Sequence, residues 1–217
     1  MQQRCSKTMV LFACLLFISP WVMGSSQEDE IVEEMLKIAE TWHRNKGFER
    51  EIAMYKRILE RYPQTTLLAT VKFNLAECYK LTGKFEEAKK LYEELRTDYP
   101  QSKEASLSIL KEAEILSKEG KHEEAVSLLH SFIDSHPQDS LVPKALLMIG
   151  EEQYKMGKTS DAVNSYKLLL RTYSSDPIWD QALENLRSIW SEMAVLKYIS
   201  DEYRKEKAFD DFLNLWN

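Results

Sequence analysis

The sequence has few of the residues that interrupt helices: six glycines and six prolines among 217 residues. Most of them stand at regular positions, and no stretch rich in them is long enough to serve as a linker between domains. Hydrophobic residues make up 44% and charged residues 29% of the chain. These are ordinary proportions for a folded protein, so extensive disorder is disfavoured.

Cysteine is also scarce, and two of the three cysteines lie within residues 1–24. Those residues have the pattern of a secretory signal peptide, with cations, an apolar run of 15 residues and small residues for cleavage. The features are Arg4 and Lys7, the run from Met9 to Met23, and Val22 and Gly24. A membrane-spanning helix needs about 20 apolar residues, and Pro20 interrupts this run. We therefore predict a cleaved signal, with an uncleaved inner-membrane anchor as the alternative.

The chain without that segment is acidic and has one cysteine. Removing its two cations from the 29 Lys and Arg leaves 27 against 35 Asp and Glu, a formal charge of −8. Nucleic acids and anionic membrane surfaces need a clustered basic face, so both are disfavoured as main partners. An internal disulfide is excluded because only Cys78 remains. We predict that Cys78 is a buried, inert thiol.

The sequence also lacks the patterns of common catalytic and metal sites. It has no Gly-rich phosphate loop, no nucleophile elbow and no Cys–His pairing. Its histidines do not stand at ligand spacing with cysteine or acidic partners. The four are His43, His122, His130 and His136. We therefore predict a protein that is not an enzyme and has no metal site and no cofactor.

The glycines and prolines that are present mark an internal repeat of 37 residues. They are Gly83, Gly120 and Gly157, and Pro63, Pro100 and Pro137, each proline being followed by glutamine. Each unit is predicted to contain two helices. The first ends at the glycine, which accepts a left-handed conformation, and the second ends before the proline, which cannot continue a helix.

Small residues recur with the same period where the two helices of a unit must cross closely. They are Ala39, Ala76, Ala113 and Gly150 in the first helices, and Ala88, Ala125 and Ala162 in the second. The first unit is degenerate, because Glu51 replaces the alanine and Lys46-Gly47 shifts the glycine by one.

The order of small, aromatic and turn residues resembles the tetratricopeptide repeat consensus. The second unit carries it on Leu75-Ala76, Tyr79, Gly83, Ala88, Tyr92 and Pro100. Lys72 stands at the family's first-helix tryptophan position, which is a departure from the consensus. The resemblance implies an all-α fold, a right-handed α-solenoid of helix–turn–helix repeats. The period of 37 is similar to that of long-repeat bacterial envelope proteins of the outer-membrane assembly lipoprotein and Tol–Pal coordinator types.

The predicted organisation has a signal at residues 1–24 and a solenoid at 25–217. The solenoid is expected to contain four repeats, at about 28–63, 64–100, 101–137 and 138–175, and a capping helix pair at 176–217. The capping helices are predicted to divide between Met193 and Ala194. Atypical end units are expected in repeat proteins, because they cover the last hydrophobic layer.

A second periodic set occupies positions where the family's first helices line a concave groove. The apolar members are Leu36, Phe73, Leu110 and Leu147, and the acidic members four residues later are Glu40, Glu77, Glu114 and Glu151. An apolar stripe beside an acidic one suits a basic, amphipathic helix or peptide. The alternative is that the apolar residues pack against the next repeat and the glutamates only form pairs on the helix surface.

These features predict an exported scaffold or adaptor, in the periplasm or cell envelope, that binds a protein or peptide partner and performs no catalysis. The alternative is a structural envelope subunit, a homo-oligomer assembled through the C-terminal helices. The aromatic residues near the C-terminus, Phe209, Phe212 and Trp216, are expected to belong to a capping helix.

Overall fold

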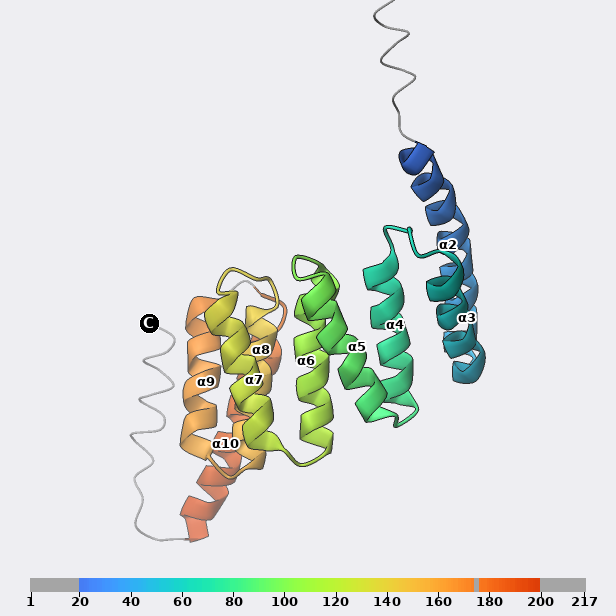
Figure 1. Ribbon diagram of the computed structural model, residues 1–217. Helices are drawn as coiled ribbons and strands as arrows, with labels where there is room; N and C mark the ends of the chain where they lie inside the picture. Colours follow the sequence, from blue (N-terminus) through green and yellow to red (C-terminus); the bar gives the residue numbers. More distant parts are fainter. Residues whose placement is uncertain (1–19, 174–175, 200–217) are drawn as a thin grey trace, which may run out of the picture. The chain divides into compact units, whose positions relative to one another are not determined.

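The computed structural model describes residues 20–173 and 176–199, and within them the chain is entirely α-helical, without strands (Figure 1). The helices are α2 (Pro20–Arg44), α3 (Phe48–Arg61), α4 (Leu68–Leu81), α5 (Phe85–Asp98), α6 (Lys103–Lys118), α7 (His122–Ser135), α8 (Val142–Lys155), α9 (Thr159–Thr172) and α10 (Trp179–Ile199). The expected all-α repeat fold is confirmed. The described residues divide after Ala105 into two compact units, unit 1 and unit 2, which are described separately.

Each glycine that was predicted to end a first helix does so in the left-handed conformation. Gly83, Gly120 and Gly157 have φ angles of 78°, 75° and 73°. After α4, the N–H of Lys84 donates to the carbonyl of Tyr79 at 2.8 Å, which is the long hydrogen bond of a Schellman motif. The chain then reverses into the second helix, so α4–α5, α6–α7 and α8–α9 are helical hairpins.

The first hairpin, α2–α3, has no glycine at the left-handed position of its turn. Lys46 stands 37 residues before Gly83 and itself adopts the left-handed conformation, with φ of 56°, whereas Gly47 has φ of −83°. The glycine is shifted by one residue, as the sequence showed, but the left-handed turn keeps its place in the repeat. A left-handed non-glycine residue costs about 1–2 kcal/mol, so this turn is less stable than the later ones.

Polar side chains stabilise the N-terminal ends of α6, α8 and α10. The Ser102 hydroxyl accepts a hydrogen bond from the N–H three residues later at 3.1 Å and so caps α6. Asp139 and Asp176 instead accept from the N–H two residues later, at 2.8 and 2.9 Å. They therefore stabilise the turns before α8 and α10 as Asx turns.

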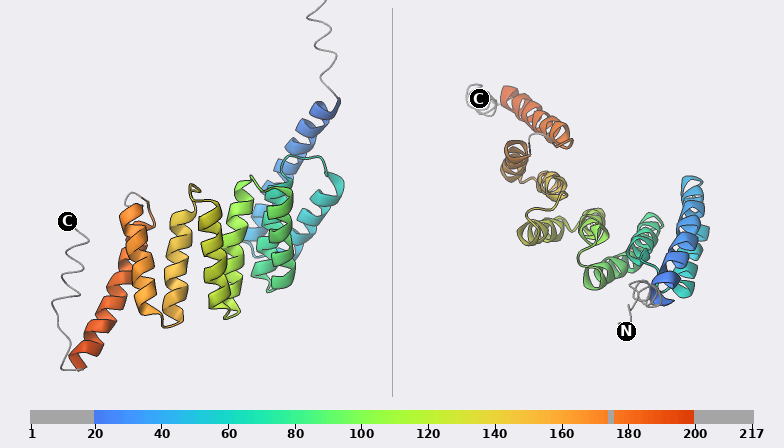
Figure 2. Two further views of the ribbon diagram at one scale, coloured as in Figure 1. Left: turned by 60° about the vertical axis from the view of Figure 1, so that its left-hand side comes forward. Right: turned by 90° about the horizontal axis from the view of Figure 1, so that it is seen from above.

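Each unit has its own hydrophobic core. The core of unit 1 contains Val32, Ala39, Ile52, Tyr55, Ile58, Val71, Leu75 and Cys78. That of unit 2 is larger and includes Phe132, Leu147, Ile149, Tyr166, Leu169 and Leu186. Trp179 and Trp190 pack against the unit 2 core and are half-buried. Viewed from above, α6 and α8 of unit 2 lie in one layer and α7 and α9 in another (Figure 2).

The periodic small residues are all buried, and Gly150 has the tightest surroundings. A Cβ atom added to Gly150 would lie 2.7 and 2.8 Å from Cζ and Cδ1 of Tyr166, whose side chain is 2% exposed. The periodicity predicted a small residue at position 150, and the close approach of α8 and α9 leaves no room for a side chain there.

We expect Gly150→Ala to lower the free energy of unfolding by about 1–2 kcal/mol. Overpacking costs roughly 1–3 kcal/mol, and the better helix propensity of alanine returns up to about 1 kcal/mol. Urea denaturation followed by helical circular dichroism measures the change. In the preceding repeat, Leu129 stands at the position of Tyr166 and Ala113 at that of Gly150. Gly150→Ala should therefore lower the free energy of unfolding less when Tyr166 is replaced by leucine. An equal loss with tyrosine and with leucine would contradict the steric explanation.

The C-terminal boundary differs from the sequence prediction. α10 runs without a break from Trp179 to Ile199, through the division expected between Met193 and Ala194. Neither glycine nor proline occurs in this stretch to end the helix. The second capping helix was predicted from Ala194 to Trp216; its first residues belong to α10, and the rest, with the aromatic residues, lies outside the described residues.

The N-terminal helix α2 begins at Pro20, within the segment predicted as a signal. The rest of that segment, residues 1–19, lies outside the described residues. Among the helices that are described, none has the length and apolar character needed to cross a membrane.

Candidate functional site

Hydrogen bonds join the first helices of successive repeats within each unit. In unit 1, Asp29 of α2 accepts from the N–H and the hydroxyl of Thr66, just before α4, both at 2.8 Å. In unit 2, Ser106 and Ser117 of α6 donate to Asp139 and Glu152 at 2.7 and 2.8 Å. The predicted groove residues therefore come from neighbouring helices, α2 and α4 in unit 1 and α6 and α8 in unit 2.

The four apolar positions of the predicted groove differ in burial. Leu36 and Phe73 are half-buried, and the Phe73 ring packs against Tyr92 with 6.2 Å between ring centroids. Leu110 and Leu147 are 3% and 0% exposed and belong to the core of unit 2. Apolar surface at these positions is thus accessible in unit 1, whereas in unit 2 it serves packing.

Glu77 has partners inside its own repeat. Its carboxylate accepts a hydrogen bond from the hydroxyl of Tyr92, which is 0% exposed, and forms an ion pair with Lys80 at 3.0 Å. Because Tyr92 belongs to α5, this hydrogen bond ties the two helices of the hairpin together. Glu77 therefore has a structural role in addition to any role in binding.

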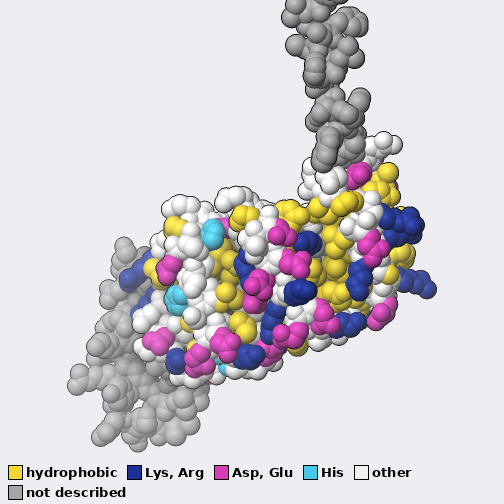
Figure 3. Space-filling model, in the orientation of Figure 1, with side chains coloured by type: hydrophobic (Ala, Val, Ile, Leu, Met, Phe, Trp, Pro, Cys, Tyr) yellow, Lys and Arg dark blue, Asp and Glu magenta, His cyan; other side chains and the backbone are white. Residues whose placement is uncertain are grey.

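The other three acidic positions lie at or near the surface. Glu40 is exposed on α2. Glu114 pairs with Lys111 at 2.7 Å, and Glu151 accepts a hydrogen bond from Gln181 at 3.3 Å. On the face drawn in Figure 3, side chains of both charge signs are interspersed along the helices. Glu40 is the most exposed member of the acidic set.

Lys72, at the family's tryptophan position, connects α4 to α5. Its ammonium lies 3.1 Å from Glu94 and 2.8 Å from Asp98 of α5, and 5.6 Å from the centroid of the Tyr99 ring. Burial lowers the pKa of Lys72, but the hydrogen bonds to Asp98 and Glu94 outweigh it and raise the pKa overall. An ion-pair network thus stands where the consensus has a large aromatic side chain.

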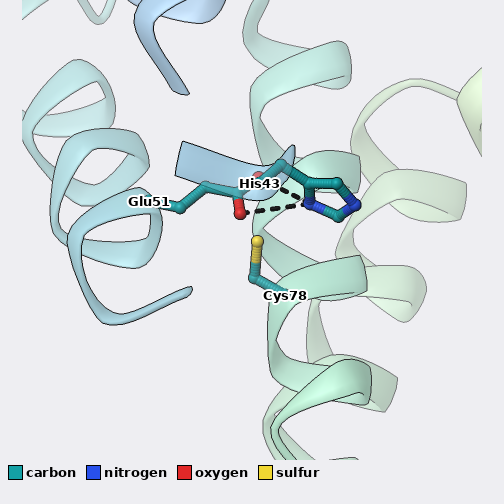
Figure 4. Close-up of side chains that lie close together, drawn as sticks. All are labelled: His43, Glu51 and Cys78. Carbon is teal, nitrogen blue, oxygen red and sulfur yellow. Dashed lines mark hydrogen bonds and ion pairs between the residues drawn. The ribbon is translucent and has the colours of Figure 1, made fainter. Parts of the chain in front are cut away.

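Three potential metal ligands from three helices lie close together in the structure: His43, Glu51 and Cys78. Nδ1 of His43 lies 3.2 and 3.1 Å from the two carboxylate oxygens of Glu51. The sulfur of Cys78 lies beside the same carboxylate (Figure 4). Sequence spacing gave no sign of this cluster, because the fold and not a local motif brings His43 to Glu51 and Cys78. The residues are too far apart in sequence for a spacing motif, and the only local signal was Glu51 at an alanine position.

Cys78 itself is buried, as predicted. Burial raises the pKa of the Cys78 thiol, and the neighbouring Glu51 carboxylate raises it further. A protonated, shielded thiol is a poor nucleophile, so the expected lack of reactivity agrees with its surroundings.

A second buried carboxylate lies in unit 2. Glu152 is 4% exposed and contacts His122 at 2.7 Å, Lys155 at 2.7 Å and Ser117 at 2.8 Å. His122 stands where two other repeats have Phe48 and Phe85, which favours a structural role. Its contact with Glu152 joins α7 to α8 and is consistent with such a role.

Comparison with known families agrees with this architecture. Residues 25–145 match a family model described as "Tetratricopeptide repeat protein 21 ARM repeat", and residues 144–176 match one described as "Tetratricopeptide repeat". The chain belongs to the tetratricopeptide repeat family. The matches together extend from within α2 to the end of α9. Repeats of this family typically form non-catalytic scaffolds that bind proteins or peptides.

Solved structures share this fold at low sequence identity. BtubC (BKLC) from P. vanneervenii is 17% identical, with a TM-score of 0.65 over 77% of this chain and 74% of that one. PilF of Pseudomonas aeruginosa is 19% identical, with a TM-score of 0.55 over 82% and 72% of the two chains. A tetratricopeptide repeat protein of Parabacteroides merdae is 15% identical, with a TM-score of 0.55 over 75% and 66%. No curated protein matches the chain.

Proposed function

We propose that this protein is a scaffold that binds a basic, amphipathic segment of a protein partner on its first helices, without a cofactor or a chemical step. The observation that carries the proposal is the surface of unit 1. There, exposed Glu40 lies one turn after half-buried Leu36 on α2, and α4 adds the half-buried Phe73. A ligand with alternating basic and apolar residues would complement both features.

The charge of the protein supports the same class of ligand. The chain has a formal net charge of −6, and α2 exposes Glu33 and Glu34 as well as Glu40. An acidic surface attracts cationic ligands and speeds their association, and salt screens this attraction over about 10 Å at 0.1 M. Binding is therefore expected to weaken as the ionic strength rises.

The proposed place of action is the cell envelope, after export. This part rests on the signal pattern of residues 1–24, with its cations, apolar run and small residues at the expected cleavage site. The intact mass of the protein purified from native envelopes tests it. A chain that begins at Ser25 would support export with cleavage, and a full-length chain in the cytosol would contradict it.

Site-specific crosslinking tests the binding surface. A photoreactive amino acid at position 40 on α2 is expected to capture a partner in native cells. The matched control has the same amino acid at Glu93, an exposed residue on the second helix α5. Capture from position 40 alone would support the first-helix surface. Equal capture from both positions would contradict it, and capture of only this protein itself would favour the self-assembling subunit.

A peptide probe measures the contribution of charge. We expect a synthetic amphipathic helix of lysine and leucine to bind the wild-type protein, and the same helix with glutamate for lysine not to bind. Glu40→Lys should weaken binding roughly three- to tenfold, because one exposed pair is replaced by a repulsive one. Glu40→Gln should have a smaller effect. Identical affinities of both peptides would refute the proposed charge complementarity.

A further inference from the structure

The cluster of His43, Glu51 and Cys78 gathers a nitrogen, an oxygen and a sulfur donor from three helices of unit 1. His43 lies near the end of α2, Glu51 is on α3 and Cys78 is on α4. One donor atom from each residue lies within 4.8 Å of the other two. All three side chains point toward the same small volume between the helices (Figure 4).

Packing alone does not explain the carboxylate. Glu51 is 2% exposed and stands where the later repeats have Ala88, Ala125 and Ala162, each 0% exposed. An alanine therefore fills this position in the repeat, and a buried carboxylate carries a desolvation cost. The hydroxyl of Tyr55 donates to Glu51 at 3.0 Å and orients it toward His43. The first repeat thus holds a charged group in a fixed direction where the fold requires only a methyl group.

We propose that His43, Glu51 and Cys78 bind a divalent transition-metal ion of the zinc type. Imidazole nitrogen, thiolate sulfur and carboxylate oxygen are the ligands that zinc uses in proteins, whereas magnesium and calcium prefer oxygen ligands alone. The site would hold the ion between α2, α3 and α4, and so cross-link the first hairpin to the second.

The distances agree with those around a tetrahedral ion. Zinc–nitrogen and zinc–oxygen bonds of about 2.0 Å at tetrahedral angles place the two donors about 3.3 Å apart. Nδ1 of His43 lies 3.1 Å from Oε2 of Glu51. With a zinc–sulfur bond of about 2.3 Å, the nitrogen and the sulfur would be about 3.5 Å apart. In the structure, the ligand atoms of His43 and Cys78 lie within 4.8 Å of each other. Small side-chain rotations therefore suffice to bind the ion.

The charges also balance. A divalent cation bound to one thiolate, one carboxylate and a neutral imidazole forms a neutral group, which suits a site where Glu51 and Cys78 are buried. Binding replaces the proton of the Cys78 thiol, which leaves to solvent. The His43 side chain is 49% exposed, so the ion can enter along this edge. The three protein ligands leave a fourth position for water or for a donor from a partner.

Titration of the metal-free, reduced protein with zinc tests the proposal. Isothermal titration calorimetry should show one ion per chain, with about one proton released, as measured in buffers of different ionisation enthalpy. Cobalt used in place of zinc should show a thiolate-to-metal charge-transfer band. Cys78→Ser should abolish this band, and both Cys78→Ser and His43→Gln should weaken zinc binding at least about tenfold.

His130→Gln is the matched control, because it removes an exposed histidine from α7 and should leave both the affinity and the cobalt band unchanged. The exposed position of His43 makes His43→Gln the variant that should fold normally. Wild-type protein that binds no zinc would overturn the proposal. So would zinc binding that His43→Gln leaves unchanged, or a cobalt band that persists in Cys78→Ser.

Discussion

Glu77→Lys is expected to lower the free energy of unfolding by about 2–4 kcal/mol. The carboxylate accepts a hydrogen bond from the fully buried Tyr92 and pairs at 3.0 Å with Lys80, which is 6% exposed. A lysine removes the acceptor from Tyr92 and places a second ammonium beside Lys80. Both changes act where α4 packs against α5, so the hairpin should be destabilised rather than a surface contact alone.

Two matched variants separate these causes. Glu77→Gln keeps an oxygen that can accept from Tyr92 and only removes the charge, so its cost should be about 1 kcal/mol. Tyr92→Phe removes the donor, and in a Glu77→Lys background it should lessen the cost of the reversal. Urea denaturation of the four proteins of this cycle gives the coupling energy. A Glu77→Lys protein as stable as the wild type would show that the hydrogen bond contributes nothing.

Because Glu77 stabilises the hairpin, its charge reversal is a poor test of the binding surface. A loss of partner binding in Glu77→Lys could arise from a damaged hairpin as well as from a lost contact. Glu40 is exposed on α2, so its reversal changes the surface charge without removing a buried bond. The binding experiment therefore rests on Glu40, and Glu77 reports on the fold.

The repeat and its turns were predictable from sequence because they depend on the backbone. A left-handed turn selects glycine, as at Gly83, and a crossing that admits no side chain selects glycine, as at Gly150. The left-handed turn recurs every 37 residues, and the close crossing recurs as a small residue, alanine at Ala39, Ala76 and Ala113 and glycine at Gly150. Lys46 shows the limit of this reasoning, because the surrounding hairpin holds a residue in the left-handed conformation despite its cost.

The side-chain contacts of the candidate sites were not predictable in this way. Leu110 and Leu36 occupy equivalent positions, yet one is 3% exposed and the other is half-buried, because their neighbours differ. His43 and Cys78 are distant in sequence and meet only because α3 brings α2 and α4 together. A periodic pattern identifies equivalent positions, but the partners of each side chain come from residues that the period does not relate.

Glu152→Ala is expected to have the largest effect on stability, a loss of about 3–5 kcal/mol. The carboxylate is 4% exposed and serves three donors, Lys155, His122 and Ser117, at 2.7 to 2.8 Å. They come from α6, α7 and α8, so this single group joins three helices of unit 2. Without it, the donors around the buried position lose a common acceptor, and the cavity left by the side chain adds to the cost.

Glu152→Gln removes the charge of the side chain and keeps its shape. The difference in stability between the wild type and this variant should depend on pH. Burial raises the pKa of Glu152, but the hydrogen bonds from Lys155, His122 and Ser117 outweigh it, so the pKa lies below its usual value of 4.5. A carboxyl group whose pKa is lowered by folding binds its proton more readily in the unfolded chain. Its contribution is therefore complete above about pH 4.5 and declines as the pH falls through the folded-state pKa.

The stability of the wild type relative to Glu152→Gln should accordingly decrease as the pH falls below about 4.5. Urea denaturation of both proteins across this range measures the difference, and the subtraction removes the titration of carboxylates elsewhere in the chain. A difference that stays constant below pH 4.5 would show that the charge of Glu152 does not stabilise the fold. A difference that grows in acid would mean that the folded chain holds the protonated carboxyl more tightly than the unfolded chain does.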